Sequence, residues 1–398
     1  MSMFSAVAMA PRDPILGLNE QFAADTSPHK VNLGVGVYYD DEGKLPLLAC
    51  VRQAEQQMNA SPKARGYLPI DGIAAYDQAV KSLVFGATSE PVTSGRVATV
   101  QALGGTGGLK IGADFLRQLS PQAQVLISDP SWENHRALFT QAGFTVGSYA
   151  YYDAARRGVN FDGMLAALHG AAAGTIVVLH ACCHNPTGYD ITPAQWDQVV
   201  AACQARQLVP FLDMAYQGFG HGIAEDGAVI GKFVAAGLTF LVSTSFSKSF
   251  SLYGERVGAL SVLCQDKDEA ARVLSQLKIM IRTNYSNPPT HGGTVVAAVL
   301  GTPELRALWE KELGEMRVRI KQMRVALVDK LKAAGVKQDM SFITDQIGMF
   351  SYSGLSKDQM VRLRDEFSVY GTDTGRMCVA ALNSKNIDYV CQSIAKVI

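Results

Sequence analysis

The chain has 398 residues, of which 48% are hydrophobic and 18% charged, which is enough for two domains or for one large domain with an accessory lobe. Lysine plus arginine and aspartate plus glutamate each number 36, so the net charge is zero and gives no electrostatic argument for nucleic acid or an anionic membrane. We therefore expect small molecules, or a second copy of the chain, as partners.

The cysteines and the N-terminus indicate a reduced, soluble protein. The cysteines are seven in number and form no CxxC pair, which is typical of cytosolic chains rather than of a disulfide framework. Cys182, Cys183 and His184 are adjacent, but neighbouring strand positions face opposite ways, so we predict no metal site. No targeting segment is evident, nor is an apolar run of about 20 residues, so we expect a cytoplasmic protein without membrane contact.

Apolar runs alternate with helical patterns through most of the chain. We predict strands at residues 97–103, 124–130, 145–150, 175–180, 208–213, 239–243 and 257–263. Helices are predicted at residues 48–58, 109–119 and 135–142, and another begins at Thr192, where a capping threonine precedes Pro193 and Gln195 stands at the third helical position. This alternation favours an α/β fold with a mostly parallel, doubly wound sheet.

The C-terminal part has a different pattern. Leucine, isoleucine and methionine recur every three to five residues between positions 303 and 334, which predicts one long helix. We expect it to lead into a smaller α+β domain with strands near residues 347–353 and 376–381. The predicted division is an N-terminal arm with part of the small domain (1–45), a large domain (46–305) and a C-terminal small domain (306–398).

Several predicted strands end in residues that suit ligand binding, which in open α/β sheets occurs beyond the carboxyl ends of the strands. The glycine run 104–108 lies between a strand and a helix, where it is either a phosphate loop or an ordinary turn. It lacks the Gly-Lys-Ser/Thr of a Walker loop and the last glycine of a dinucleotide fingerprint. Without a Walker loop, Asp213 at another strand end does not indicate a magnesium-dependent ATPase.

Two further strand ends carry polar or aromatic residues. Trp132 offers either core packing or a flat face on which an aromatic ring can stack. Asn185 precedes a proline, which forces an extended conformation that can aim its amide into a site, although an ordinary turn has the same sequence.

The stretch TFLVSTSFSKSFSLYGERVG, residues 239–258, places Lys248 just past an apolar strand. Serine and threonine hydroxyls surround this lysine, and Arg256 follows. A lysine in this setting can condense with an aldehyde while its neighbours hold a phosphate, which is what pyridoxal phosphate requires. A lysine that merely reaches solvent at a strand end is the alternative.

Seven segments in this order resemble the class I aminotransferases, in particular the aspartate and aromatic-amino-acid branch with pyridoxal phosphate (PLP) fold type I. They are GGTGGLKIGADFL, SDPSWENH, CCHNPTG, FLDMAYQGFG, SFSKSFSLYGERVG, RTNYSNPP and GRMCVA, and the resemblance covers essentially the whole chain. It implies a transaminase that moves an amino group between tyrosine, phenylalanine or aspartate and 2-oxoglutarate. The alternatives are a strict aspartate transaminase, a β-lyase or decarboxylase on the same fold, a PLP-binding protein without turnover, and a nicotinamide dehydrogenase.

The resemblance implies a role for each residue around the cofactor ring. Lys248 would form the Schiff base and move the substrate's α-proton, and Asp213 would pair with the pyridinium nitrogen. His135 and His180 would support Asp213, while Asn185 and Tyr216 would donate hydrogen bonds to the 3′ oxygen. Trp132 would stack on the ring. The phosphate would be held by Gly105, Thr106, Ser245, Ser247, Arg256 and, from a second subunit, Tyr67.

Substrate binding is expected to rely on arginines, because a guanidinium matches a carboxylate bidentately. The resemblance assigns the α-carboxylate to Arg376 and the side-chain carboxylate to Arg282 of a neighbouring subunit, which implies a homodimer. Trp132 and Asn185 would also contact substrate, and Gly36 would lie on a segment that closes over it. Two departures stand out: Gly104 replaces a serine of many relatives, and residues 372–374 (Thr-Asp-Thr) place a charge near Arg376.

Overall fold

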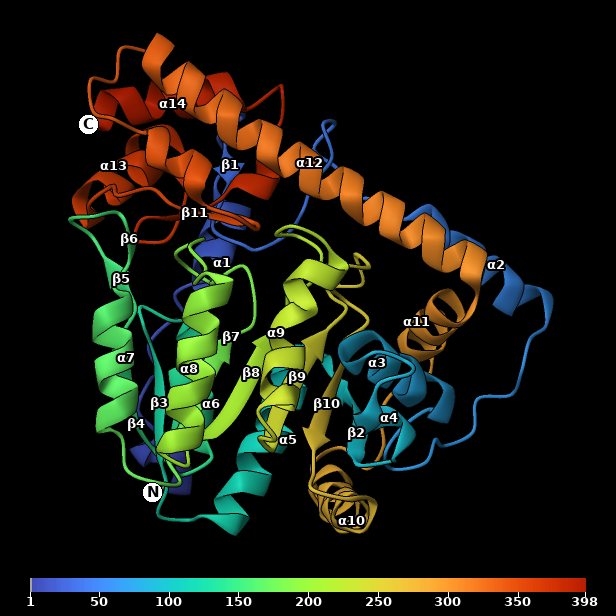
Figure 1. Ribbon diagram of the computed structural model, residues 1–398. Coiled ribbons are helices and arrows are strands. Elements are labelled where there is room, and N and C mark those ends of the chain that lie inside the picture. The colour runs from blue at the N-terminus through green and yellow to red at the C-terminus, as the bar shows by residue number, and fades with distance from the viewer. Residues whose placement is uncertain (1) are drawn as a thin grey trace. The chain divides into compact units, whose positions relative to one another are not determined.

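The computed structural model describes residues 2–398, which divide into two compact units. The larger unit comprises Leu45–Lys321 and Gln346–Gly348. The smaller unit comprises the chain up to Lys44, Gln322–Asp345 and Met349–Ile398. Helix α12 (Pro303–Ala333) begins in the larger unit and ends in the smaller one, and it is the single long helix that the periodicity predicts (Figure 1).

The larger unit is built on a seven-stranded sheet with the order β2-β10-β9-β8-β7-β3-β4. Strand β10 pairs antiparallel with both of its neighbours, and the other pairs are parallel, so the predicted mostly parallel sheet is confirmed. The bounds are β2 (Val97–Leu103), β3 (Gln124–Asp129), β4 (Thr145–Ala150), β7 (Ile176–His180), β8 (Val209–Met214), β9 (Phe240–Ser245) and β10 (Val257–Leu263).

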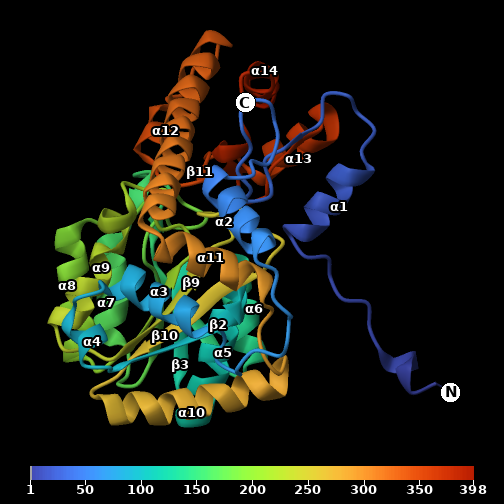
Figure 2. The same cartoon turned by 90° about the vertical axis from the view of Figure 1, so that its right-hand side faces the viewer.

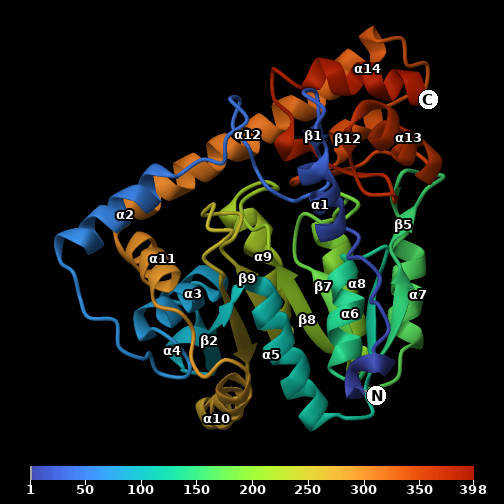
Figure 3. The same cartoon turned by 180° about the vertical axis from the view of Figure 1, so that it is seen from behind.

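Helices cover both faces of this sheet. Helices α7 (Phe161–Gly170), α8 (Pro193–Ala205) and α9 (Ile223–Ala235) lie in front of it in Figure 1. Helices α5 (Gly104–Leu119) and α6 (Glu133–Gln141) cover the opposite face in Figure 3. Because both faces are covered, the central strands read as continuous apolar runs, and all residues of β9 and β10 are buried.

Helices of the larger unit also pack around the edge formed by β2. Helix α10 (Lys267–Asn284) packs against β2 and α5, as Figure 2 shows. Helix α3 (Ala74–Phe85) also contacts β2, and α11 (His291–Gly301) packs on α2 (Ala49–Ala60) and α3. The short α4 (Glu90–Thr93) and the hairpin of β5 (Tyr152–Asp153) with β6 (Gly158–Val159) complete the unit.

The start of α5 differs from the predicted loop at residues 104–108. The helix already begins at Gly104. Its glycines let it approach the sheet closely, since a Cβ at Gly108 would lie 2.6 Å from Ser243 Oγ and 2.8 Å from the Ala259 carbonyl oxygen. Tertiary packing therefore outweighs the low helix propensity of glycine here. By contrast, the capping box of Thr192 and Gln195 is present as predicted at the start of α8.

The smaller unit combines helices with two short sheets. Strands β1 (Val31–Asn32) and β12 (Val369–Tyr370) pair in parallel, and β11 (Phe350–Tyr352) pairs antiparallel with β13 (Arg376–Cys378). Its helices are α1 (Leu16–Ala24), α13 (Lys357–Phe367) and α14 (Ile387–Val397), with 3₁₀ turns at Met3–Ala6, Ser341–Asp345 and Val379–Ala381. The strand predicted at residues 376–381 thus ends at Cys378 and continues as a 3₁₀ turn.

Candidate active site

Six parallel strands of the large sheet end at one edge, and this brings distant parts of the sequence together. The register pairs His180 of β7 with Asp213 of β8, and Asp213 with Ser243 of β9. The antiparallel β10 starts at the same edge, because its first residue, Val257, pairs with Leu103, the last residue of β2. The candidate site lies beyond this edge, as expected for an open α/β sheet.

Asp213 is the buried anion of this edge. His135 Nε2 lies 2.8 Å from Asp213 Oδ2, although the two residues are 78 positions apart in the chain. Burial alone would raise the pKa of Asp213, but the hydrogen bond and charge of His135, together with the charge of Lys248, hold the pKa below its usual value. The structure therefore provides a carboxylate that stays ionised and can face a cation.

Two histidines lie near Asp213, and they differ in their hydrogen bonds. His135 is fully buried, and its Nδ1 lies 2.9 Å from Ser131 Oγ. The ring of His180 lies 4.9 Å from that of His135, and neither nitrogen of His180 has a hydrogen-bond partner among the described residues. Burial, reinforced by His135, lowers the pKa of His180 to about 3, so this imidazole is neutral. Ser131 was not singled out from the sequence, because its link to His135 depends on the start of α6.

Donors suited to a phosphate converge at the N-terminus of α5. Gly105 lies against Ser245, since a Cβ built at Gly105 would be 3.2 Å from Ser245 Cβ. Arg256 Nη1 donates a hydrogen bond to Ser247 Oγ at 3.3 Å, and Thr106 lies in the first turn of the helix. Backbone N–H groups, hydroxyls and a guanidinium at a helix N-terminus together form a favourable anion site.

Gly104 has a structural reason for lacking a side chain. Its φ is +68°, a conformation that favours glycine, and its N–H donates to the Arg256 carbonyl oxygen at 3.0 Å. A Cβ at this position would lie 2.5 Å from Arg256 Nη2. Glycine in place of serine at this position therefore leaves room for the guanidinium of Arg256.

Lys248 follows β9 and lies close to the other residues of this edge. Its Nζ is 5.3 Å from the centre of the Tyr216 ring, and Tyr216 is buried. Asn185 is also buried, in the turn that follows β7. Trp132 precedes α6, and its indole packs edge-on against His135 with the ring centres 5.3 Å apart.

Tyr67 and Arg282 lie outside this buried cluster. Tyr67 is 96% exposed. Arg282 is exposed near the end of α10, where its guanidinium donates to Ser286 Oγ. Next to Tyr67 is a cavity of about 650 Å³, formed by α2, residues 59–68 and α11.

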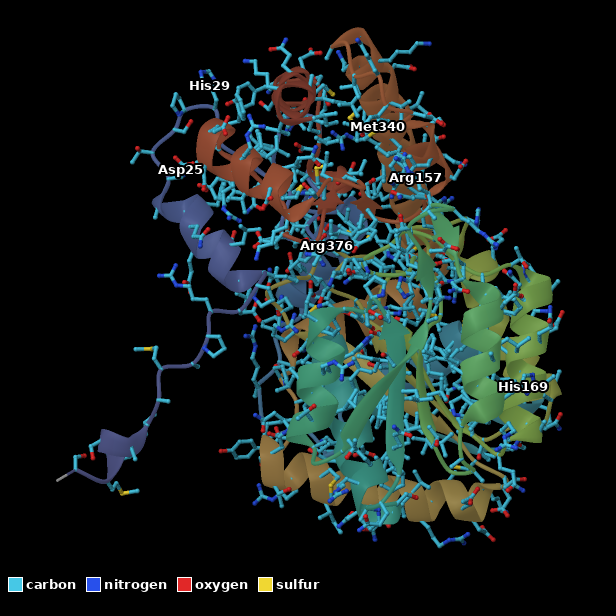
Figure 4. All side chains as sticks on the ribbon, turned by 90° about the vertical axis from the view of Figure 1, so that its left-hand side faces the viewer. Asp25, His29, Arg157, His169, Met340 and Arg376 are labelled. Carbon is cyan, nitrogen blue, oxygen red and sulfur yellow. The ribbon has the colours of Figure 1, made fainter. Side chains whose placement is uncertain are left out.

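Within the smaller unit, Gly36 and Arg376 both contact Phe350. Figure 4 labels Arg376, which is buried. Its guanidinium carbon lies 4.4 Å from the centre of the Phe350 ring, and its Nη2 donates to the Gly34 carbonyl oxygen at 2.7 Å. A Cβ at Gly36 would lie 2.6 Å from Phe350 Cζ. The carboxylate of Asp373 pairs with Arg364 at 2.9 Å, so the charge that we expected near Arg376 is compensated within this unit.

Cys182 and Cys183 do not have the alternating strand geometry that the sequence predicts. Both cysteines follow the end of β7 rather than lying on it, and their sulfur atoms and an Asp226 oxygen lie within 4.8 Å of one another. The Asp226 carboxylate already accepts hydrogen bonds from the backbone of Gly218, Gly220 and His221. All seven cysteines are buried and free of disulfides.

The fold and this site are those of one class of enzyme, and comparison with known proteins identifies it. Residues 28–394 match the family of class I and II aminotransferases, and the chain belongs to this family. Within the part of the chain that the structure describes, no helix is long and apolar enough to cross a membrane.

The most similar relatives divide between two specificities. The chain is 62% identical to an aspartate aminotransferase of Pseudomonas aeruginosa, over the full length of both. It is 50% identical to an aromatic-amino-acid aminotransferase of Escherichia coli, covering 99% of this chain and all of that one. A crystal structure of an aromatic-amino-acid aminotransferase from Burkholderia pseudomallei, covalently bound to pyridoxal phosphate, has a TM-score of 0.97 with 67% identity over both whole chains. The predicted fold type and transaminase class are confirmed.

Proposed function

We propose that this aminotransferase exchanges amino groups between L-amino acids and 2-oxo acids with pyridoxal phosphate bound covalently to Lys248. The observation that carries the proposal is the convergence of a basic side chain, a buried carboxylate and an anion site at one sheet edge. The Asp213 carboxylate, whose pKa is lowered, fits a ring cation. The N-terminus of α5 with Ser245, Ser247 and Arg256 fits a phosphate. The cofactor, when bound, supplies an electron sink for the bond that is broken at the substrate's α carbon.

Each residue of the site has a role in this proposal. Asp213, held by His135, keeps the pyridine nitrogen protonated. Asn185 and Tyr216 donate hydrogen bonds to the 3′ oxygen of the cofactor and lower the pKa of its link to Lys248. Lys248 would hold the cofactor, and its amine, when free, would take up and return the proton of the substrate's α carbon. His180 supports Asp213 and Trp132 stacks on the ring.

Two arginines bind substrate in this proposal. Arg376 takes the α-carboxylate, and its contact with Phe350 fixes the guanidinium beside Gly36. Arg282, contributed by a second subunit, takes the side-chain carboxylate of aspartate or glutamate. We also propose that the chain divides into an N-terminal arm (1–45), a large domain (46–305) and a small domain (306–398). The proposed location of the protein is the cytoplasm.

A homodimer explains the exposure of Tyr67 and Arg282. An aromatic side chain that is 96% exposed beside a largely apolar cavity is unusual for a monomer surface. We propose that a second copy covers this cavity, and that Tyr67 reaches the phosphate of the second copy.

For the substrate we propose dual use, with tyrosine, phenylalanine and aspartate as donors and 2-oxoglutarate as acceptor. The relatives include aspartate and aromatic-amino-acid aminotransferases, and the segments YLPIDG and FSLYGERVG resemble the aromatic branch. An aromatic side chain gains about 25 cal/mol per Å² of buried apolar surface. Arg282 turns toward solvent when such a substrate is bound, since burying it unpaired is costly. A strict aspartate transaminase is the competing hypothesis, and the relative from Pseudomonas aeruginosa favours it.

The activity is tested first on the purified protein with 2-oxoglutarate and a panel of amino donors. Reduction with borohydride, followed by peptide mapping, should place the pyridoxyl label on Lys248. A label on another lysine would overturn the assignment of the site. Absence of visible absorption after incubation with pyridoxal phosphate would overturn the proposed function itself.

The substrate is tested by kcat/KM for aspartate and phenylalanine. Arg282→Ala should lose aspartate activity steeply while phenylalanine activity changes little, and Arg272→Ala, which removes another exposed arginine of α10, serves as the control. A wild-type preference for aspartate of more than about a thousandfold, roughly 4 kcal/mol in transition-state binding, would refute dual use in favour of a strict aspartate transaminase.

A further inference from the structure

The turn that carries Asn185 is held by the carboxylate of Asp190, which has no role in the proposed function. Asp190 lies five residues after Asn185 and accepts two hydrogen bonds from successive backbone N–H groups. Cys183 N–H donates to Oδ2 at 2.6 Å, and His184 N–H donates to Oδ1 at 2.8 Å. Successive N–H groups that converge in this way form an anion-binding concavity in the backbone.

The conformation of the turn depends on this contact. Cys183 has a φ of +51°, which is uncommon for a residue other than glycine, asparagine or aspartate. Such conformations persist where surrounding contacts fix them. Gly348 is one such contact, because a Cβ at this glycine would lie 2.6 Å from Cys183 Cβ. The Asp190 carboxylate is the only charged acceptor that the described residues offer to the Cys183 and His184 N–H groups.

The ring of His184 is fixed independently of Asp190. Its Nε2 lies 2.9 Å from Ser128 Oγ, its Nδ1 lies 2.9 Å from Thr187 Oγ1, and Tyr151 stacks on it at 3.9 Å between ring centres. The side chain on one side of Asn185 is thus anchored to the sheet. Among the described residues, Asp190 is the acceptor for the Cys183 and His184 N–H groups, which set the direction of the chain into Asn185.

We propose that Asp190 is a positioning residue that aims the amide of Asn185 at the 3′ oxygen of the cofactor, and so sets the pKa of the link between the cofactor and Lys248. This rests on the proposed function of Asn185. Without the carboxylate, the N–H groups of Cys183 and His184 lose their acceptor and the turn relaxes. Asn185 then no longer stabilises the negative 3′ oxygen, and the proton on the lysine link is held more tightly.

The charge state of Asp190 is consistent with this role near neutral pH. Burial raises the pKa of Asp190 to about 6, while the two backbone hydrogen bonds oppose the shift. The charge of Asp226 also raises the pKa of Asp190, and the charge of His221 lowers it. Cys182, Cys183 and Tyr151 are the other titratable groups that face Asp190. The carboxylate is therefore ionised above about pH 6 and can accept both N–H groups.

The test is a pH titration of the visible absorption of the PLP-loaded protein. Asp190→Ala and Asn185→Ala should each shift the midpoint upward by about one pH unit, a tenfold change in proton affinity. The double variant should shift it no further than Asn185→Ala alone, since both act on one hydrogen bond. The matched control is Asp153→Ala, which removes a carboxylate that accepts two backbone N–H groups in another turn, from Ala155 at 2.9 Å and Arg156 at 3.1 Å. Its midpoint should match wild type.

Hydrogen exchange of the cofactor-free protein gives a second readout. The amides of residues 183–185 should exchange faster in Asp190→Ala than in wild type. A wild-type midpoint in Asp190→Ala, or shifts that add in full in the double variant, would overturn the proposal. If Asp190→Ala does not fold, Asp190→Asn decides: it keeps one acceptor oxygen and should give a smaller upward shift, and an unshifted midpoint would refute the proposal. A wild-type midpoint in Asn185→Ala would instead refute the proposed role of Asn185.

Discussion

Gly258 lies where β10 passes the start of α5, and replacing it by alanine should disturb both stability and cofactor binding. A Cβ at this position would lie 2.4 Å from the Gly104 carbonyl carbon, 2.5 Å from its oxygen and 2.7 Å from the Thr244 carbonyl oxygen. These distances are about 1 Å shorter than van der Waals contact. All three atoms belong to the backbone, so no side chain can rotate away to relieve the overlap.

The cost can be estimated from this geometry. Overpacking a core typically costs about 1–3 kcal/mol, and the rigid neighbours place Gly258→Ala near 3 kcal/mol. The Gly258 carbonyl oxygen also accepts a hydrogen bond from the buried Tyr76 hydroxyl at 2.6 Å, which a displaced strand would weaken. Movement of Gly104 shifts the N-terminus of α5, and loss of one charge-assisted hydrogen bond to the phosphate should weaken PLP binding about tenfold or more.

The assay is urea unfolding of the cofactor-free protein at fixed protein concentration, together with a PLP titration. Gly231→Ala is the matched control, because no atom outside the neighbouring turns of α9 lies within 4 Å of a Cβ at this helical position. It should raise the free energy of unfolding by about 0.5–1 kcal/mol and leave PLP binding unchanged. An unfolding free energy of Gly258→Ala within about 0.5 kcal/mol of wild type would refute the steric argument.

Three further predictions follow from the same structure. Asp213→Ala should slow proton transfer by several orders of magnitude, and Asp213→Glu should retain much more activity; wild-type turnover in Asp213→Ala would falsify its role. Mixing Lys248→Ala subunits with Arg282→Ala subunits should restore aspartate activity at one site per heterodimer, and no recovery of aspartate activity after demonstrated exchange would count against shared sites. Burial, then the charge of Asp71, raises the pKa of Asp77 from 3.8 to about 8. The folded state therefore binds the extra proton, and stability should fall as pH rises from about 4 to 8. Asp77→Asn should flatten this dependence, and an unchanged slope in urea unfolding would contradict it.

The sequence alone predicted the features that depend on short stretches of chain. Apolar runs of strand length gave the seven strands of the large sheet within two residues of their observed ends. The start of α8 followed from Thr192 and Gln195, because a capping box is completed within four residues. The resemblance of seven segments to one family identified the class of enzyme, which the comparisons confirm.

Tertiary structure decided whatever depends on contacts between distant residues. Glycine has a low helix propensity, so the first turn of α5 could not be predicted until its close approach to Ser243 and Ala259 was known. The hydrogen bond between His135 and Asp213 joins residues that are 78 positions apart in the chain. The hydrogen bond from the Cys183 N–H to Asp190 depends on how the chain turns after β7. Propensity and periodicity describe each segment separately. The energy of a buried charge or a close backbone contact depends on which segments the fold brings together.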